Sequence, residues 1–327
     1  MFGIISFGGY YGCKNGENFM LFKTWLNTWL DSYVAPAAKH RTIERYRLTV
    51  DLHILPYLGD YDMDDITPLT LQKHVTELTR NGNRKTNAGL SVNTVNMVIS
   101  VLRGAMYTAF TLGVTKSFPA EKIKRPRPSE RKIECFSMKE QAKIEKAVLA
   151  SDKPKLLGVV VCLYTGLRIG ELLALRKNDY DPATKTFGIA HSCHDGKTGR
   201  ITDTPKTPAS SRVIPVPKQL LPIVSLLKKG DSDYLITENG NPVSVRSYQR
   251  SFELLLRKLK IPHRGFHALR HTFATRALEC GMDVKTLSEI LGHQNPSVTL
   301  KRYTHSLMEH KKEMMNRLGK SLKMFTE

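Results

Sequence analysis

Apolar residues recur at helical spacing through the first third of the chain. The first such stretch covers residues 19–34, where aromatic and leucine side chains lie three or four positions apart. Three more stretches follow at residues 42–55, 69–82 and 92–112. Gly82 suits the end of the third stretch, and Ser91 suits the N-cap of the fourth. The pattern predicts an all-helical first domain over residues 19–112 and leaves residues 1–18 unassigned.

A proline-rich, basic stretch follows this helical region. Residues 113–131 contain three prolines, which interrupt regular secondary structure, so we interpret the stretch as a linker. Lys122, Lys124, Arg125, Arg127 and Arg131 make it basic. Two interpretations stay open: a solvated hinge, or a strap in which the first four of these side chains lie along a phosphate backbone.

The rest of the chain has a mixed pattern. Ser137 and Glu140 have the spacing of a capping box, and helices are expected at about 138–150, 156–166 and from Ile169 onward. Between about 185 and 216, β-branched and aromatic residues lie among Gly and Pro, which predicts a small antiparallel sheet. Helical patterns resume at 217–228, 245–260, 267–280 and 284–291, and Asn295-Pro296 begins another. The fold class is therefore mainly α with a small antiparallel β-sheet (α+β). The sheet lies in a second domain over residues 132–320, and an apolar stripe marks a tail over residues 306–327.

The net charge narrows the choice of partner. The 327 residues carry 50 Lys and Arg against 30 Asp and Glu, a formal net charge of +20. Residues 113–327 hold 39 of these basic residues and 21 of the acidic ones. Such an excess favours a polyanionic partner, DNA or RNA before an anionic membrane surface.

Several classes of protein are disfavoured. Five scattered cysteines without a C-x-x-C pair do not form a disulfide framework, and they indicate a reducing cytoplasm. The longest strongly apolar stretch has 12 residues, too short for a transmembrane helix, and the N-terminus lacks a signal peptide's basic region.

His267 and His271 have zincin spacing, but Ala268 stands where the general-base Glu should be. Gly196-Lys197-Thr198 lacks the first glycine of a P-loop. We therefore expect chemistry without a metal or a cofactor.

Four segments remain that combine Arg, Lys, His and Tyr. They are TGLRIGE at residues 165–171, PKT at 205–207 followed by SRVIP at 211–215, HALRHT at 267–272, and LGH at 291–293, ten residues before Tyr303. Each alone is weak, because an Arg at a helix start or a lone His is usually structural. In this order and spacing they strongly resemble the tyrosine recombinase family, also called phage-type integrases, over roughly residues 19–320.

The resemblance implies a role for each residue. Arg168 and Arg270 would hold the oxygens of a DNA phosphate and offset its charge. Tyr303 would be the nucleophile that forms a 3′-phosphotyrosine, and Lys206 the general acid that protonates the leaving 5′ oxygen.

Three further assignments complete the site. His267 would assist proton transfer, and His293 would hydrogen-bond the phosphate. Glu171, one helical turn after Arg168, would orient that arginine, unless it is a surface residue. Lys185 and Lys197 also lie near the expected hairpin and stay open as alternatives to Lys206.

The resemblance also implies an assembly. The helical core-binding domain and the catalytic domain would close as a clamp around double-stranded DNA. The protein would be a monomer when free and a homotetramer on DNA, with the tail docked on a neighbouring protomer and an accessory bending or excision factor. The implied function is site-specific recombination for a mobile element. A type IB topoisomerase and a catalytically silent DNA-binding regulator are the alternatives.

Overall fold

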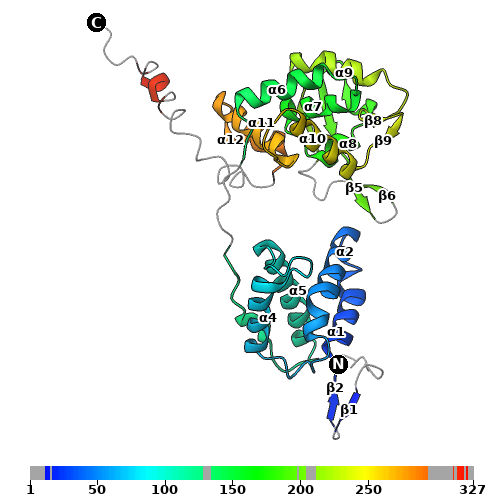
Figure 1. Cartoon of the computed structure of the whole chain (residues 1–327), viewed down its shortest axis with the longest axis vertical. Helices are drawn as coiled ribbons and strands as arrows, with labels where there is room; N and C mark the ends of the chain where they lie inside the picture. Colours follow the sequence, from blue (N-terminus) through cyan, green and yellow to red (C-terminus); the bar gives the residue numbers. More distant parts are fainter. Residues whose placement is uncertain are drawn as a thin grey trace. The chain divides into compact units, whose positions relative to one another are not determined.

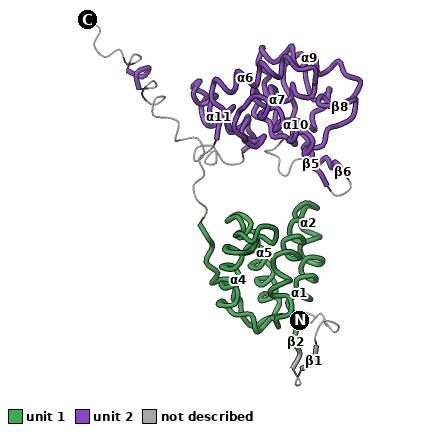
Figure 2. The backbone as a smooth tube through the Cα atoms, viewed as in Figure 1, with its two compact units in different colours: residues 1–131 green, residues 132–327 purple. Residues whose placement is uncertain are grey.

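The computed structural model describes residues 12–14, 17–127, 134–196, 199–203, 211–293, 312, 315–319 and 322. The chain divides into two compact units, residues 1–131 and 132–327 (Figure 2). Each unit has a hydrophobic core of its own. None of the helices in the described ranges is long and apolar enough to cross a membrane.

The first unit is a helical bundle (Figure 1). Its α-helices are α1 (Phe22–Trp29), α2 (His40–Thr49), α3 (Leu55–Leu58), α4 (Pro68–Asn81) and α5 (Val92–Thr111). The predicted cap of α5 is confirmed, because the Ser91 hydroxyl accepts a hydrogen bond from the backbone N–H of Thr94. Buried Trp25 donates its indole N–H to the carbonyl of Ala105 at 2.9 Å, which holds α1 against α5.

The bundle differs from the expected pattern in two places. The helix expected to stop near Pro56 and Gly59 does end there, at Leu58, but it contains a π-helical turn (Val50–Ile54) before α3. Pro56 is tolerated there because it lies in the first turn of α3, where a missing N–H costs little. A hairpin of β1 (Gly12–Lys14) and β2 (Glu17–Phe19) precedes the helices, mostly in the segment left unassigned.

The expected linker is anchored on the first unit as far as it is described. Pro119–Lys122 form a short 3-10 helix, and Ala120 and Ile123 are buried in the core of the bundle. The Arg103 guanidinium of α5 donates to the carbonyls of Ala120, Glu121 and Ile123 at 3.1, 2.9 and 3.0 Å. Residues 113–127 therefore extend the first unit, and residues 128–131 lie outside the described ranges.

The second unit is built around one buried helix. Its α-helices are α6 (Met138–Leu149), α7 (Leu157–Thr165), α8 (Ile169–Ala174), α9 (Leu221–Lys228), α10 (Val245–Lys258), α11 (His267–Glu279) and α12 (Val284–Leu291). The capping box of Ser137 and Glu140 at α6 is confirmed. Helix α7 is apolar on every side and packs against α6, α8, α9 and α11 (Figure 1), as a helix without a polar face must.

The expected small sheet is divided into two antiparallel parts. Strands β3 (Tyr180–Asp181), β4 (Thr186–Ile189) and β7 (Arg212–Pro215) form one sheet, in the order β3-β4-β7. Strands β5 (Ser192–Gly196) and β6 (Gly199–Asp203) pair only with each other, and a short hairpin of β8 (Thr237–Glu238) and β9 (Asn241–Pro242) follows later.

Helices hold the β5–β6 hairpin apart from the other strands. A Cβ on Gly170 of α8 would lie 2.5 Å from the Cys193 carbonyl oxygen, so only glycine permits this approach of α8 to β5. At the other end of β5, the Asp195 carboxylate accepts hydrogen bonds from the backbone N–H groups of Val245 and Arg246 at 2.9 and 2.8 Å. These two tertiary contacts explain why the hairpin does not continue the sheet.

We predict that Gly170→Ala destabilises the protein by about 2 kcal/mol, because the added methyl group must push α8 away from β5. Urea unfolding of the full chain measures the change. Gly230→Ala is the matched control, since a Cβ at Gly230 meets no atom within 4 Å. Equal stability of the two variants would contradict the close packing of α8 on β5.

Candidate active site

The site begins at the turn between α7 and α8. Gly166 ends α7 with a φ of +66°, a conformation that glycine adopts without strain. Arg168 follows as the N-cap residue of α8, and its backbone N–H donates to the Glu171 carboxylate at 2.9 Å. The sequence TGLRIGE thus encodes a tight helix-to-helix turn that presents the Arg168 side chain.

The carboxylate of Glu171 receives two guanidiniums. Its Oε1 accepts from Nη1 of Arg168 at 2.7 Å and from Nη1 of Arg212 at 3.2 Å, and its Oε2 accepts from Nη2 of Arg212 at 2.9 Å. The side chains of Glu171 and Arg212 are each 7% exposed, whereas that of Arg168 is 38% exposed. Burial alone would raise the pKa of Glu171, but the hydrogen bonds and charges of Arg212 and Arg168 outweigh burial and lower it to about 2. Glu171 is therefore a buried, ionised partner of two arginines and not a surface residue.

Arg212 is the site residue that sequence reasoning quoted without giving it a role. It lies on β7 and also donates from Nε to the carbonyl of Ile290, in the last turn of α12, at 2.6 Å. The sequence does carry a signal for it. Side chains alternate along a strand, so Arg212 shares the inward face with buried Ile214, and an inward arginine requires a buried partner.

Arg270 lies between the ends of two helices. It comes from α11 and is only 2% exposed. Its Nη1 donates to the carbonyl of Gly166 at the end of α7 at 2.8 Å, and its Nη2 to the carbonyl of Leu291 at the end of α12 at 2.6 Å. The same Nη2 lies 2.9 Å from Nε2 of His293. Because a guanidinium only donates, Nε2 of His293 is the acceptor in this contact.

The turn after α12 joins these groups. Gly292 has a φ of +63°, and its carbonyl oxygen lies 3.5 Å from Nη2 of Arg168. A Cβ on Gly292 would lie 3.0 Å from the Arg212 guanidinium, so the turn packs directly on that side chain. The structure thus brings together Arg168, Glu171, Arg270 and His293 around one short turn.

The other predicted residues have different outcomes. His267 is the first residue of α11, one helical turn before Arg270, and its ring packs edge-on against that of His271 with centroids 4.6 Å apart. Lys185 is exposed, in the turn between β3 and β4. Lys206, its alternative Lys197 and Tyr303 lie outside the described residues.

The basic residues of the expected linker, as far as it is described, lie on the first unit. Lys122, Lys124, Arg125 and Arg127 are all exposed. The Arg125 guanidinium donates to the Ser100 hydroxyl of α5 at 3.2 Å, and the backbone N–H of Lys124 donates to the Gln72 side chain of α4 at 2.9 Å. These basic side chains therefore project from an anchored backbone.

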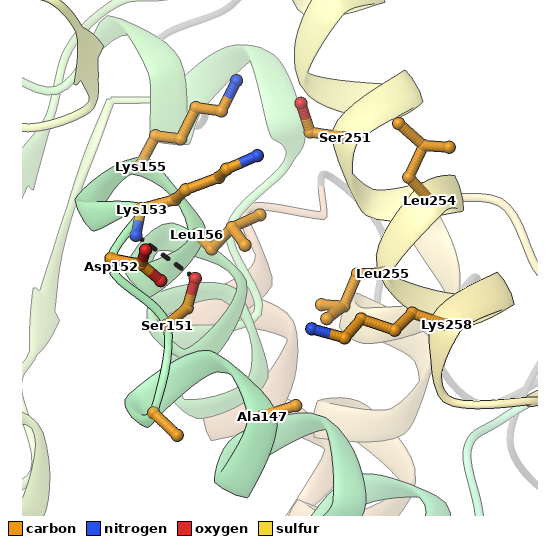
Figure 3. Close-up of a pocket in the computed structure, with 11 residues that line it drawn as sticks. Ala147, Ser151, Asp152, Lys153, Lys155, Leu156, Ser251, Leu254, Leu255 and Lys258 are labelled. Atoms are coloured by element: carbon orange, nitrogen blue, oxygen red, sulfur yellow. Dashed lines mark hydrogen bonds between the residues drawn. The ribbon is translucent and has the colours of Figure 1, made fainter.

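The second unit also contains a cavity (Figure 3). Its volume is about 370 Å³, and it lies between α6, the 3-10 turn Pro154–Leu156 and α10. Figure 3 shows Lys153, Lys155 and Lys258 around it. None of the predicted site residues lines this cavity, so it plays no part in the candidate site.

Comparison with known proteins decides the family. The model of the phage integrase family matches residues 138–310, and that of the phage integrase N-terminal SAM-like domain matches residues 21–79. The chain belongs to the phage integrase family. The resemblance inferred from the four sequence segments is thereby confirmed, and every predicted catalytic residue lies within the first matched range.

Named relatives of this recombinase agree with that family. Tyrosine recombinase XerC of Chlamydia pneumoniae is 30% identical, over 72% of this chain and 75% of the relative. A XerC-like tyrosine recombinase of Caldanaerobacter subterraneus subsp. tengcongensis is 29% identical, over 94% of this chain and 86% of the relative. The transposase of transposon Tn916 from Enterococcus faecalis is 26% identical, over 87% of this chain and 74% of the relative.

Solved structures share the fold. A Tn1549 transposon integrase in complex with transposon right-end DNA has a TM-score of 0.78 at 22% identity, covering 92% of this chain and 100% of that one. A lambda integrase dimer bound to a COC′ core site has a TM-score of 0.65 at 17% identity, covering 87% of this chain and 77% of that one. The predicted fold class, mainly helical with small antiparallel sheets, is therefore that of a tyrosine recombinase.

The low pKa of Glu171 predicts a pH-dependent contribution to stability. Because folding lowers this pKa from 4.5 to about 2, the contribution is complete above pH 4.5 and is lost as the pH falls toward 2. We expect the free energy of unfolding of the wild type to exceed that of Glu171→Gln by an amount that shrinks by about 3 kcal/mol over this window.

Urea unfolding at a series of pH values between 7 and 2 measures this difference. Glu289→Gln, at an exposed position of α12, is the control and should change stability by less than about 0.5 kcal/mol at each pH. A wild-type advantage over Glu171→Gln that does not vary with pH would contradict the ion pairs of Glu171.

Proposed function

We propose that this protein carries out site-specific recombination for a mobile element. It would cleave and rejoin duplex DNA through a 3′-phosphotyrosine. One observation carries the proposal. Arg168 and Arg270, from distant sequence segments, both contact the short turn at residues 291–293, which carries His293. The Glu171 carboxylate binds the guanidiniums of Arg168 and Arg212, and the Arg270 guanidinium adds a third positive charge to the described part of the cluster. A site of this charge suits one phosphodiester.

The proposed reaction needs no external energy source. The Tyr303 oxygen attacks the phosphorus, the bond to the 5′ oxygen breaks, and Lys206 gives that leaving oxygen a proton. Arg168 and Arg270 hold the two non-bridging oxygens and offset the charge that grows on them in the transition state, assisted by His293. The phosphotyrosine retains the energy of the broken bond, so a 5′-hydroxyl of another strand reverses the step and rejoins the DNA.

The charge distribution and the relatives support double-stranded DNA as the partner. Most of the net charge of +20 lies in residues 113–327, and the exposed basic residues at 122–127 add an anchored positive surface to the first unit. Similar folds have been solved as a Tn1549 transposon integrase on DNA and as a lambda integrase tetramer bound to a Holliday junction. We propose by analogy that the two units clamp DNA and that four protomers exchange strands, with residues 306–327 docked on a neighbour.

Replacing the nucleophile tests the proposed chemistry. We predict that Tyr303→Phe forms no covalent adduct with a nicked suicide substrate, because only the attacking oxygen is lost, while its affinity for the DNA stays close to that of the wild type. Gel electrophoresis under denaturing conditions detects the adduct. Adduct formation by the Phe variant would reject the assignment of Tyr303 as the nucleophile. Absence of an adduct with the wild type would reject the proposed cleavage activity.

A wild type that relaxes supercoils but makes no crossed-strand product from two sites would be a topoisomerase.

A sulfur substitution identifies the general acid. We predict that Lys206→Ala cleaves DNA slowly, and that a substrate whose 5′ leaving oxygen is replaced by sulfur restores its rate, since a thiolate leaves without a proton. Lys197→Ala is the matched control and should show no such rescue. If the sulfur substrate rescues the Lys197 variant and leaves the Lys206 variant inactive, Lys197 is the general acid.

A further inference from the structure

We propose that Arg212 is a positioning residue: it neutralises Glu171, so that the charge of Arg168 stays available to the scissile phosphate. This inference rests on the proposed recombinase function. Arg212 itself is nearly buried, and its guanidinium bonds to protein groups in α8 and α12. Its effect on the reaction would therefore pass through Glu171 and Arg168.

The hydrogen bonds of Glu171 show how the charge is shared. Arg212 occupies both carboxylate oxygens with its two terminal nitrogens, at 3.2 and 2.9 Å. Arg168 uses its backbone N–H and only one guanidinium nitrogen, Nη1, on the same carboxylate. The fork from Arg212 is thus the more complete ion pair, and it is also the more buried one.

Removing Arg212 would change the role of Arg168. A buried carboxylate without a compensating charge is costly, so Glu171 would then depend on Arg168 alone. An arginine that must balance an adjacent carboxylate attracts a phosphate less strongly, because the two anions compete for one guanidinium. With Arg212 in place, Arg212 and Glu171 together are neutral, and Arg168 adds a full positive charge to the site.

Arg212 also connects the strand that follows Lys206 to the turn that carries His293. It is the first residue of β7, six residues after Lys206 in the sequence. Its Nε bonds to the Ile290 carbonyl, and the backbone of Gly292 packs against its guanidinium. A lysine has no planar fork and could not make these bonds together. Arg212 therefore sets the position of the turn as well as the charge balance of Glu171.

Single-turnover cleavage of a nicked suicide substrate tests the inference, with DNA affinity measured in parallel. Arg212→Gln should cleave roughly 10- to 100-fold more slowly than the wild type, as expected for the loss of a charge-assisted interaction, while still binding DNA. The variant that carries both Arg212→Gln and Glu171→Gln should cleave at least about tenfold faster than Arg212→Gln alone, because the competing carboxylate is gone. A purely structural role predicts the opposite, since the second substitution removes further hydrogen bonds.

Two more variants make the result decisive. Arg264→Gln is the matched control, because Arg264 forms a similar part-buried pair with Glu140 at 2.9 Å in the same unit, and it should cleave at the wild-type rate. Arg212→Lys keeps the charge and loses the fork, so it should cleave faster than Arg212→Gln. It provides the test if the Gln variant does not fold.

A folded, DNA-binding Arg212→Lys without activity would overturn the inference. So would a double variant no faster than Arg212→Gln, or an Arg212→Gln as fast as the wild type. If the wild type itself forms no adduct, the proposed function fails instead.

Discussion

The cost of burying charge fixes the geometry of this site. Glu171 and Arg212 are each 7% exposed and come from residues 41 positions apart, yet each supplies the charge that the other needs. Separating them would leave a buried ion without a partner, at a cost of roughly 3–5 kcal/mol. Helix α8, strand β7 and the end of α12 are therefore held in one arrangement. The backbone N–H of Arg168 donates to the same carboxylate, which holds the base of the Arg168 side chain in position.

Arg270 is a second buried charge, and backbone carbonyls stabilise it. The last carbonyls of a helix have no partner within the helix and carry partial negative charge. Arg270 donates to two such carbonyls, Gly166 at the end of α7 and Leu291 at the end of α12. Both helices end in glycines with positive φ, Gly166 and Gly292, which turn these carbonyls out of the helical path. The backbone carbonyls thus stabilise the buried guanidinium of Arg270.

The sequence predicted what depends on local pattern. The helices, the Ser91 cap and the capping box at Ser137 each follow from residues within one or two turns. The division of the sheet was not predicted, because it depends on the approach of Gly170 to β5, a contact between segments that no periodicity reveals. The order of Arg, His and Tyr segments indicated the family and hence the cluster. The partner of Arg212 could not be named from the chain alone, although its inward position on β7 required one.

Repulsion among the arginines also explains why the cluster is attached to strongly buried helices. Arg168, Arg212 and Arg270 repel one another, and the Glu171 carboxylate, which binds Arg168 and Arg212, offsets part of this repulsion. The folded chain holds them together because the surrounding helices are strongly buried, above all α7, which is apolar on every side and ends at Gly166. Under the proposed function, a phosphodiester brings the negative charge that the cluster lacks. Binding then relieves repulsion that folding has already imposed, and little rearrangement is needed when charge grows on the phosphate in the transition state.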